Sequence, residues 1–569
     1  MRYRNVFLTL QAKYKGMATK SVTKTKSSAS IQSSTNGLSN TNGSSPKPSH
    51  DPSLPKTLGA LKASGWVSRS VKEEMRDNLL KAIAEGRQPF EGIVGYESSV
   101  IPQVMQAILA KHDILLLGLR GQAKTKLLRL LPQLLDEVIP YIEGSEIYDN
   151  PYEPLSVYGR SLVAQHGDET PIDWLPRAHR YGEKLATPDT TVADLIGDLD
   201  PIKAAANKLS LADEQVIHFG LIPRSNRGIF VINELPDLQP RIQVALLNIM
   251  QERDIQIRGF NLRIPLDLSI AFSANPEDYT NRGNIITPLK DRIDAQIITH
   301  YPKKRSIAKD ITLQQAWIDR GSDTSAPVVH LSPLMHDIIE QVTFEARESD
   351  YIDQKSGVST RLSLTAMEQV ISSAERRAVQ HGYNETQVRM MDLYQMVPAL
   401  TGKMELVYEG EQEGAVQVAK HLIGKAVNQV FKTYFPDPQN KSSKSARALY
   451  GSILAWFAQG EELNLTEALD DASYVKEAQR VEGLQEAVDE ILSGLKKIAK
   501  ADHEMISEEA LESKWKSSWL DLVLEGLHQN SVLGKDHLHE KMVYTDLVGS
   551  VLGGLGGDED AEDEYEEDV

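Results

Sequence analysis

The feature that most constrains this chain is a glycine-containing loop between an apolar run and a helical run. Residues Ile114–Leu117 have the length of a buried strand, and Gly-Leu-Arg-Gly-Gln-Ala-Lys-Thr follows at 118–125. A helical pattern begins at 126. Glycines let backbone N–H groups face an anion, and the helix N-terminus adds its positive dipole. The sequence therefore predicts a phosphate-binding strand–loop–helix unit.

Individual residues of this loop have expected tasks. Lys124 is expected to reach the β- and γ-phosphates, and Thr125 is expected to contact Mg²⁺. Ala123 departs from the strict pattern, which has glycine before the lysine, and a ligand-free loop–helix junction is the alternative interpretation. Pro132 predicts that the helix ends or kinks nearby, because proline removes a ladder hydrogen bond. The other loop residues expected to line the nucleotide are Gly118, Gly121 and Gln122.

Two further apolar runs end in polar residues. The run at 229–232 leads into Asn233 and Glu234, where a nucleotide hydrolase places a Mg²⁺-organising acid and a glutamate that activates or orients water. An asparagine at 233 can bind a Mg²⁺-bound water but brings no negative charge. The run at 268–272 leads to Asn275, which we expect to position that water.

Two arginines follow Asn275. Arg292 lies in a Lys-Asp-Arg segment, and Arg282 precedes Gly283. An isolated arginine is usually a solvated surface residue, so only its place in the series marks Arg292 as a candidate catalytic residue. Arg282 is the second choice.

The ordered set of motifs resembles the AAA+ ATPases of the MoxR and magnesium chelatase clade, and is most similar to the magnesium chelatase ATPase (I) subunits. The resemblance covers about 88–400. Matching segments are the adenine-side motif at 93–95, the Walker A loop at 118–125, the Walker B strand at 228–235, sensor 1 at 272–279, the arginine-finger segment at 288–294 and the sensor 2 region at 359–363.

This resemblance implies an α/β fold: an AAA+ P-loop NTPase core, with a parallel sheet flanked by helices, then a helical lid and a further helical C-terminal region. It implies that Val94 and Gly95 contact the adenine side of ATP. It also implies that Arg292 acts from a neighbouring subunit and that Arg361 couples the lid to the nucleotide. Departures from the family are Asn233, a 140–185 insertion without cysteines, and about 150 extra C-terminal residues.

Composition and pattern divide the chain into five expected parts. We expect helices rather than strands after about residue 306, where a stripe such as Leu364, Met367, Ile371 and Ala374 recurs at helical spacing. The expected parts are a disordered basic Ser/Thr-rich arm at 1–55, the nucleotide-binding domain at 56–304 with insertions at about 140–220, the lid at 305–435, a helical extension at 436–550, and a Gly-rich hinge with an acidic disordered tail at 551–569.

Charge and composition exclude several function classes. The chain has 569 residues and a net charge of −18, and the part between its basic start and acidic end is itself acidic. Nucleic acid is therefore not the default partner, because nucleic-acid binding leaves a basic footprint. The chain has no cysteine, which excludes disulfides and thiolate metal sites. It also has no apolar run of membrane-spanning length, which excludes a membrane-spanning helix. We expect a cytoplasmic protein.

The first functional hypothesis is a Mg²⁺-dependent ATPase, with ATP and Mg²⁺ as cofactors. It would form a homo-oligomeric ring, expected to be a hexamer from the resemblance, and remodel a protein partner or drive metal insertion by it. The partner would be a separate chain such as an integrin-type (von Willebrand A) domain protein, since no Asp-x-Ser-x-Ser site occurs here. The alternative is a non-catalytic ATP-gated adaptor whose hydrolysis is weakened by Asn233. Tetrapyrrole metallation would need partner subunits.

Overall fold

The computed structural model describes residues 53–207, 216–251, 264–276, 284–320, 326–440, 443–499, 508–538 and 541–547. The predicted N-terminal arm, up to residue 52, and the predicted hinge and acidic tail lie outside the described residues. Arg282 also lies outside them.

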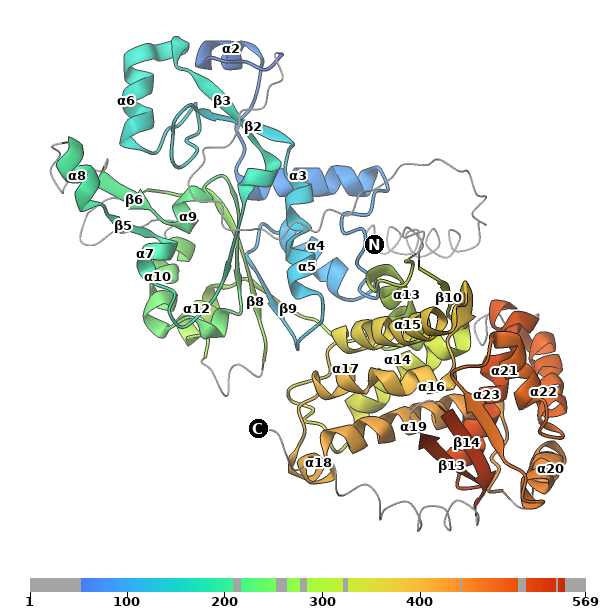
Figure 1. The fold of residues 1–569 in the computed structure, drawn as a ribbon. Coiled ribbons are helices and arrows are strands. Elements are labelled where there is room, and N and C mark those ends of the chain that lie inside the picture. Colours follow the sequence, from blue (N-terminus) through green and yellow to red (C-terminus); the bar gives the residue numbers. More distant parts are fainter. Residues whose placement is uncertain are drawn as a thin grey trace, which may run out of the picture. The chain divides into compact units, whose positions relative to one another are not determined.

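A parallel sheet organises the nucleotide-binding part of the described chain (Figure 1). Its five strands run in the order β4-β7-β8-β1-β9, and every neighbouring pair is parallel. The three apolar runs expected from the sequence are the strands β1, β7 and β8. The elements of this part are α2 (Leu58–Ala63), α3 (Val71–Ala84), α4 (Val100–Leu109), β1 (Ile114–Leu117), α5 (Lys124–Leu128), β2 (Val138–Ile142), α6 (Val157–His166), β3 (Ile172–Pro176), β4 (Tyr181–Leu185), α7 (Val192–Leu195), β5 (Gly197–Leu199), α8 (Pro201–Asn207), β6 (Ile217–Phe219), α9 (Leu221–Arg224), β7 (Gly228–Asn233), α10 (Pro240–Gln251), β8 (Leu268–Ala274), α12 (Thr287–Arg292) and β9 (Ala295–Ile298).

Both faces of this sheet are buried, which explains why its strands are continuous apolar runs rather than alternating ones. On β7, Ile229 and Val231 pack with α3, α4 and α5, whereas Phe230 and Ile232 pack with α7, α9, α10 and α12. Successive side chains of a strand point to opposite faces, so each strand serves two cores. Figure 1 shows the helices on the two sides.

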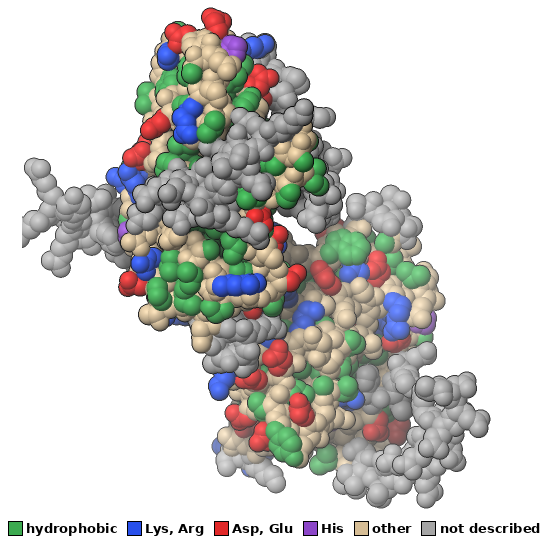
Figure 2. Space-filling view, turned by 90° about the vertical axis from the view of Figure 1, so that its left-hand side faces the viewer, with side chains coloured by type: hydrophobic (Ala, Val, Ile, Leu, Met, Phe, Trp, Pro, Cys, Tyr) green, Lys and Arg blue, Asp and Glu red, His purple; other side chains and the backbone are tan. Residues whose placement is uncertain are grey.

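Two antiparallel strand pairs, each joined by a connection that contains a helix, lie between α5 and β7. Strand β2 pairs antiparallel with β3, and β5 pairs antiparallel with β6. Both fall within the segment of about 140–220 where the sequence predicts insertions, although β2 already begins at Val138. Figure 2 shows one face of the molecule, on which hydrophobic side chains lie among acidic and basic ones.

The C-terminal part is mainly helical, and one buried cluster extends through it from Leu334 to Tyr544. The predicted lid and the predicted C-terminal extension therefore share one hydrophobic core. Its elements are α13 (Arg305–Gln315), β10 (Val328–His330), α14 (Pro333–Glu348), α15 (Arg361–His381), β11 (Glu385–Gln387), α16 (Met390–Leu393), α17 (Val397–Thr401), α18 (Tyr408–Glu413), α19 (Ala415–Tyr434), α20 (Lys444–Ala458), β12 (Leu463–Thr466), α21 (Asp471–Ala478), α22 (Leu484–Ala499), α23 (Lys516–Gln529), β13 (Leu533–Leu538) and β14 (Lys541–Asp546).

The expectation that strands end after about residue 306 is wrong. Strands β12, β14 and β13 form an antiparallel sheet, and β10 pairs with β11. These strands are short, and β13 carries Lys535, Asp536 and His537, so no apolar run announces it. Within the described ranges, every helix is too short or too polar to cross a membrane.

Candidate functional site

The predicted phosphate loop connects β1 to α5, and its backbone needs glycine at two positions. Gly121 has a φ of +72°, in the left-handed region. At Gly118, a Cβ atom would lie 1.9 Å from the Thr299 hydroxyl oxygen, which itself donates to the Gln122 side-chain oxygen at 2.6 Å. The loop is thus packed tightly against the end of β9.

Ala123 adopts the conformation that glycine usually provides at its place. Its φ of 56° and ψ of 17° lie in the left-handed helical region. For a residue with a Cβ atom, this conformation costs about 1–2 kcal/mol. Ala123 therefore has a glycine-like backbone conformation at the start of α5, and the packing of the surrounding loop maintains this strained conformation.

Lys124 is buried, with 7% of its surface exposed. Its ammonium donates to the carbonyl oxygen of Leu119 at 3.0 Å and also to that of Gly118, so the side chain folds over the loop. Thr125 follows on α5 and is half-buried. Helix α5 has five residues, and Pro132 lies in a 3₁₀ turn immediately beyond it. The prediction that this helix ends near Pro132 is confirmed.

The predicted adenine-side residues lie beside the same loop. Gly95 has a φ of +87°, and a Cβ atom there would lie 2.7 Å from a methyl carbon of Ile307. The neighbouring Tyr96 hydroxyl lies 2.8 Å from the Gln122 carbonyl oxygen and 2.9 Å from that of His300. Burial raises the pKa of Tyr96 to about 12, so this hydroxyl stays protonated. Tyr96 thereby fastens the Val94–Gly95 turn to the phosphate loop.

Asn233 ends β7 and is held between the two neighbouring strands. Its amide nitrogen donates to a Glu183 carboxylate oxygen on β4 at 2.7 Å. Its amide oxygen accepts from the Ser273 hydroxyl on β8 at 2.9 Å. With 5% of its surface exposed, the amide is buried and fixed in orientation.

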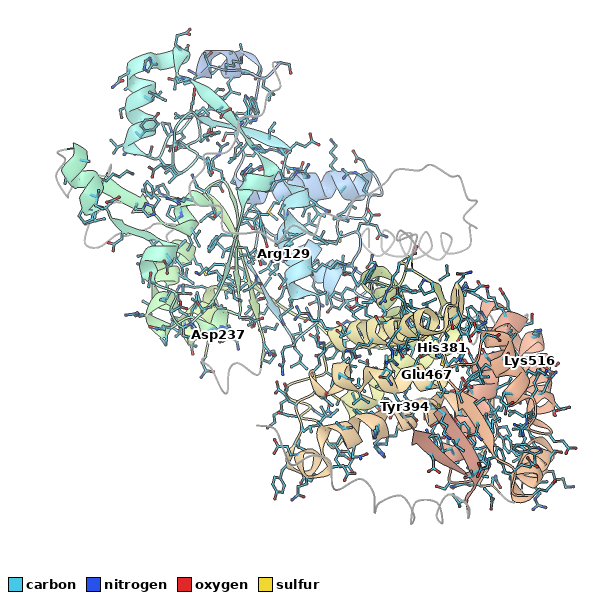
Figure 3. All side chains as sticks on the ribbon, in the orientation of Figure 1. Arg129, Asp237, His381, Tyr394, Glu467 and Lys516 are labelled. Atoms are coloured by element: carbon cyan, nitrogen blue, oxygen red, sulfur yellow. The ribbon has the colours of Figure 1, made fainter. Side chains whose placement is uncertain are left out.

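Glu183 and Arg129 are two residues of this edge that sequence reasoning missed. Arg129, which follows the last residue of α5, donates to both Glu183 carboxylate oxygens at 2.9 and 3.0 Å. Figure 3 shows Arg129 beside the sheet. No motif marks either residue, since β4 is an edge strand with polar side chains. Only the knowledge that β4 lies next to β7 would have directed attention to Glu183.

Glu234 and Asn275 follow the ends of adjacent strands. Glu234 is half-buried, has a φ of 54°, and its backbone N–H donates to the Ser273 hydroxyl at 3.3 Å. Asn275 follows β8 and is buried. Because β7, β8 and β1 are neighbours and parallel, their carboxyl ends bring Asn233, Glu234 and Asn275 to the edge that carries the phosphate loop.

The two predicted arginines lie in different settings. Arg292 ends α12, and its guanidinium donates to the Gln251 side-chain oxygen of α10 at 2.7 and 2.9 Å. Arg361 opens α15 and is exposed, while the preceding Thr360 donates its hydroxyl to the Gly121 carbonyl oxygen. The segment before Arg361 thus contacts the phosphate loop, whereas the described contacts of Arg292 lie on α12 and α10.

The donor atoms at this edge fit a magnesium ion better than a softer metal. They are the Thr125 hydroxyl, the Asn233 amide oxygen and the Glu234 carboxylate, with the Glu183 carboxylate behind them. Mg²⁺ prefers oxygen ligands and is commonly bound through one or two carboxylates, waters and substrate phosphates. Within the described ranges, no group of three His, Asp or Glu residues is arranged to hold a metal by itself. A nucleotide would have to supply part of the coordination.

Comparison with curated proteins identifies relatives of known class, although no family model matches the chain. The 38 kDa subunit of magnesium chelatase from Rhodobacter capsulatus is 27% identical over 267 residues, 46% of this chain and 69% of that protein. The corresponding subunit from Cereibacter sphaeroides is 27% identical over 239 residues, 41% of this chain and 65% of that protein. The chain thus spans about two thirds of the length of these relatives.

Solved structures align with much of the chain but superpose loosely. The complex of the BchI and BchD subunits of magnesium chelatase matches with 19% identity and a TM-score of 0.29, covering 57% of this chain and 98% of that one. NtrX from Brucella abortus with ADP matches with 14% identity and a TM-score of 0.30, covering 56% and 57%. At such scores, the family assignment rests on the sequence relatives.

Proposed function

Since this chain is an AAA+ ATPase of the MoxR and magnesium chelatase clade, we propose that it binds and hydrolyses Mg²⁺-ATP where β1, β7 and β8 end. The observation that carries the proposal is the juxtaposition of a strained phosphate loop with the polar ends of β7 and β8. Bound Mg²⁺ would neutralise charge on the phosphates and orient them for in-line attack.

Each residue of the site has its own proposed role in phosphoryl transfer. The Lys124 ammonium exchanges its bonds with the loop carbonyls for bonds with the β- and γ-phosphates, and Thr125 and Asn233 face the metal side. Glu234 accepts a proton from, or orients, the attacking water, and Asn275 holds that water in place. Val94 and Gly95 line the adenine side, next to the Tyr96 clamp.

Two arginines complete the proposed site from outside the sheet edge. Arg292 would enter the active site of the adjacent subunit in a homo-oligomeric ring, which we propose to be a hexamer. Arg361 would sense the nucleotide from the lid. The support for Arg361 is the contact between Thr360 and Gly121, which couples the start of α15 to the loop that the phosphates would occupy.

We further propose that the ring transmits ATP hydrolysis to a separate protein chain. The relatives are named as subunits of magnesium chelatase, so they act with other chains. A partner with an integrin-type domain fits this proposal, and metal insertion by that partner is one form that the work could take. The proposed domains are 56–304 for nucleotide binding, 305–435 for the lid and 436–550 for the extension.

The contact between Asn233 and Glu183 weakens the case for a non-catalytic adaptor. It rests on Asn233, which brings no charge, yet Glu183 lies within 2.7 Å of the Asn233 amide and carries a carboxylate. The edge therefore retains an acid, on a neighbouring strand. This observation favours a catalytic protein over an adaptor.

The proposed function is tested by titrating the purified protein with ATP in the presence of Mg²⁺. We expect saturable binding and phosphate release, and we expect Lys124→Ala to abolish binding. A matched control is Lys62→Ala, because Lys62 forms an exposed ion pair with Asp168 on a different part of the domain. If Lys124→Ala binds ATP as tightly as the wild type, the phosphate loop is not the nucleotide site.

A further inference from the structure

At the end of β7, an amide and a carboxylate from neighbouring strands form a pair that no sequence motif predicts. Asn233 stands where this class of ATPase usually has an acid, and an acid stands beside it on β4. We propose that Glu183 is a positioning residue, which supplies the carboxylate that Asn233 lacks and fixes the Asn233 amide for metal binding. This inference rests on the proposed function, because it concerns the Mg²⁺ that accompanies ATP.

The orientation of the amide is the first step of the argument. The sheet order β4-β7-β8-β1 puts Glu183 on one side of Asn233 and the phosphate-loop strand on the other. A carboxylate only accepts hydrogen bonds, so the amide must present its N–H group to Glu183. Its oxygen then faces Ser273 on β8 and the side of the sheet that leads to the loop. Glu183 thereby keeps an acceptor on the metal side.

The charge of Glu183 is the second step. Its side chain is 19% exposed, and Arg129 donates to both of its oxygens. The hydrogen bond to Glu183 raises the pKa of Arg129, so the guanidinium stays charged beside this carboxyl group. Because Arg129 directly follows α5, whose first residues are Lys124 and Thr125, the carboxylate is linked to the phosphate-loop helix as well as to Asn233.

The arrangement has a consequence that differs from the simple expectation for Asn233. If the only effect of Asn233 were the absence of the usual carboxylate, Asn233→Asp would raise activity. With Glu183 within hydrogen-bond distance, however, that variant puts two carboxylates where one N–H···O bond lies. Like charges at this separation repel, so one group must take a proton or move away. We therefore expect Asn233→Asp alone to impair the site.

The double variant Asn233→Asp/Glu183→Gln should restore the site. The introduced glutamine on β4 would donate its amide N–H to the introduced aspartate on β7, and one oxygen of that aspartate would still accept from Ser273. The pair would then carry the same number of charges as the wild type, with the acid and the amide exchanged. A merely structural ion pair between Arg129 and Glu183 predicts no such rescue, because the double variant still lacks the carboxylate that Arg129 binds.

The experiment measures ATP affinity of the full chain twice, with Mg²⁺ and with EDTA, together with phosphate release. We expect Glu183→Gln to lose about 10–100-fold of the Mg²⁺-dependent part of the affinity, the usual effect of removing a residue that orients a metal ligand. Asn233→Asp should also lose Mg²⁺-dependent affinity, because of the repulsion between the two carboxylates. Affinity in EDTA should be unchanged, and the double variant should recover most of the loss. Glu85→Gln is the control, since it removes an exposed carboxylate paired with Arg87 at the end of α3.

Three results would overturn the inference while leaving the proposed function intact. They are an equal loss of affinity with and without Mg²⁺ in Glu183→Gln, a higher turnover in Asn233→Asp alone, and no recovery in the double variant. Failure of the wild type to bind ATP under either condition would instead overturn the proposed function, and the inference with it.

Discussion

Two groups of paired charges in this protein contain similar residues but lie in different surroundings. At the sheet edge, the Arg129 and Glu183 side chains are 58% and 19% exposed. In the C-terminal part, the Lys535 and Glu525 side chains are 7% and 0% exposed, and Tyr394 and Tyr544 donate hydroxyls to the same carboxylate. Figure 3 shows Arg129 and Tyr394 in these two parts.

The difference separates charges available to a ligand from charges that hold a core together. A partly exposed pair can exchange its partners for a phosphate or a metal-bound water at little cost. An enclosed pair cannot, because an unpaired buried charge carries a large desolvation penalty. We therefore expect substitutions at the sheet edge to change activity more than stability, and substitutions around Glu525 to do the reverse.

Arg292 should give the largest effect on activity. An arginine acting from a neighbouring subunit contributes about 10³–10⁵ in rate. We expect Arg292→Ala to keep ATP affinity and thermal stability but to lose hydrolysis by a factor of this order. The measurement is phosphate release at saturating ATP, alongside a thermal melt. The matched control is Arg320→Ala, an arginine of the C-terminal part paired with Glu375.

Mixing experiments test whether Arg292 acts between subunits. Arg292→Ala chains mixed with Glu234→Gln chains should regain some activity, because some interfaces then combine an intact Glu234 with an intact Arg292. A monomeric protein whose specific activity does not depend on concentration would contradict the assignment. So would a loss of ATP affinity, since Arg292 would then act within its own chain through Gln251 and α10.

Glu234→Gln should give the next largest effect on activity. General-base catalysis contributes about 10²–10⁴ in rate, and glutamine keeps the shape of the side chain while removing its basicity. We expect hydrolysis to fall by this factor while ATP remains bound, as measured by phosphate release and by nucleotide titration. Robust hydrolysis by Glu234→Gln would contradict both the catalytic role and the contrast between the two regions.

The elements around the nucleotide site were predictable because their sequence signals are local. The runs that became β1, β7 and β8 are mainly apolar and buried. Gly118 directly follows β1, Asn233 is the last residue of β7, and Asn275 directly follows β8. Pro132 stops α5 through its own backbone chemistry. In each case the signal lies within a few residues of the structure that it predicts.

The features that sequence missed depend on long-range pairing. Glu183 matters because β4 lies next to β7, and that neighbour relation joins residues about fifty positions apart. Strand β12 is far in sequence from β14, whose Met542 and Tyr544 complete the C-terminal core. Sheet order is decided by the packing of the whole domain, so residue patterns do not contain it.

Glu525→Gln should test the enclosed group of charges. Burial raises the pKa of Glu525, but Lys535, His528 and Gln529 together outweigh it and lower the pKa to about 2. Removing this carboxylate leaves Lys535 buried without its counter-charge, which costs about 3–5 kcal/mol. We expect the free energy of unfolding to fall by this amount in denaturant titrations at pH 7, with ATP affinity unchanged at temperatures where the variant is folded.

The same pair predicts a pH dependence with a definite sign. Because the folded-state pKa of Glu525 is depressed, its contribution is present above the ordinary glutamate pKa of 4.5 and is lost as pH falls towards 2. The stability difference between wild type and Glu525→Gln should therefore shrink over that window. A difference that stays constant from pH 5 to pH 2 would show that the ion pair is not the source of the stabilisation.

Ala123→Gly should give the smallest effect and the opposite sign. Ala123 has a left-handed φ of 56°, so losing its Cβ relieves about 1–2 kcal/mol of strain. Glycine also raises the conformational entropy of the unfolded chain, which offsets about 0.4–1 kcal/mol of that gain. The net gain should be about 0.5–1 kcal/mol in the free energy of unfolding. The control is Ala110→Gly, whose φ of −84° is right-handed, so that it gains nothing in the folded state and loses stability. If both variants lose stability alike, the phosphate loop holds no strain at Ala123, and the sheet edge differs from the enclosed core in exposure alone.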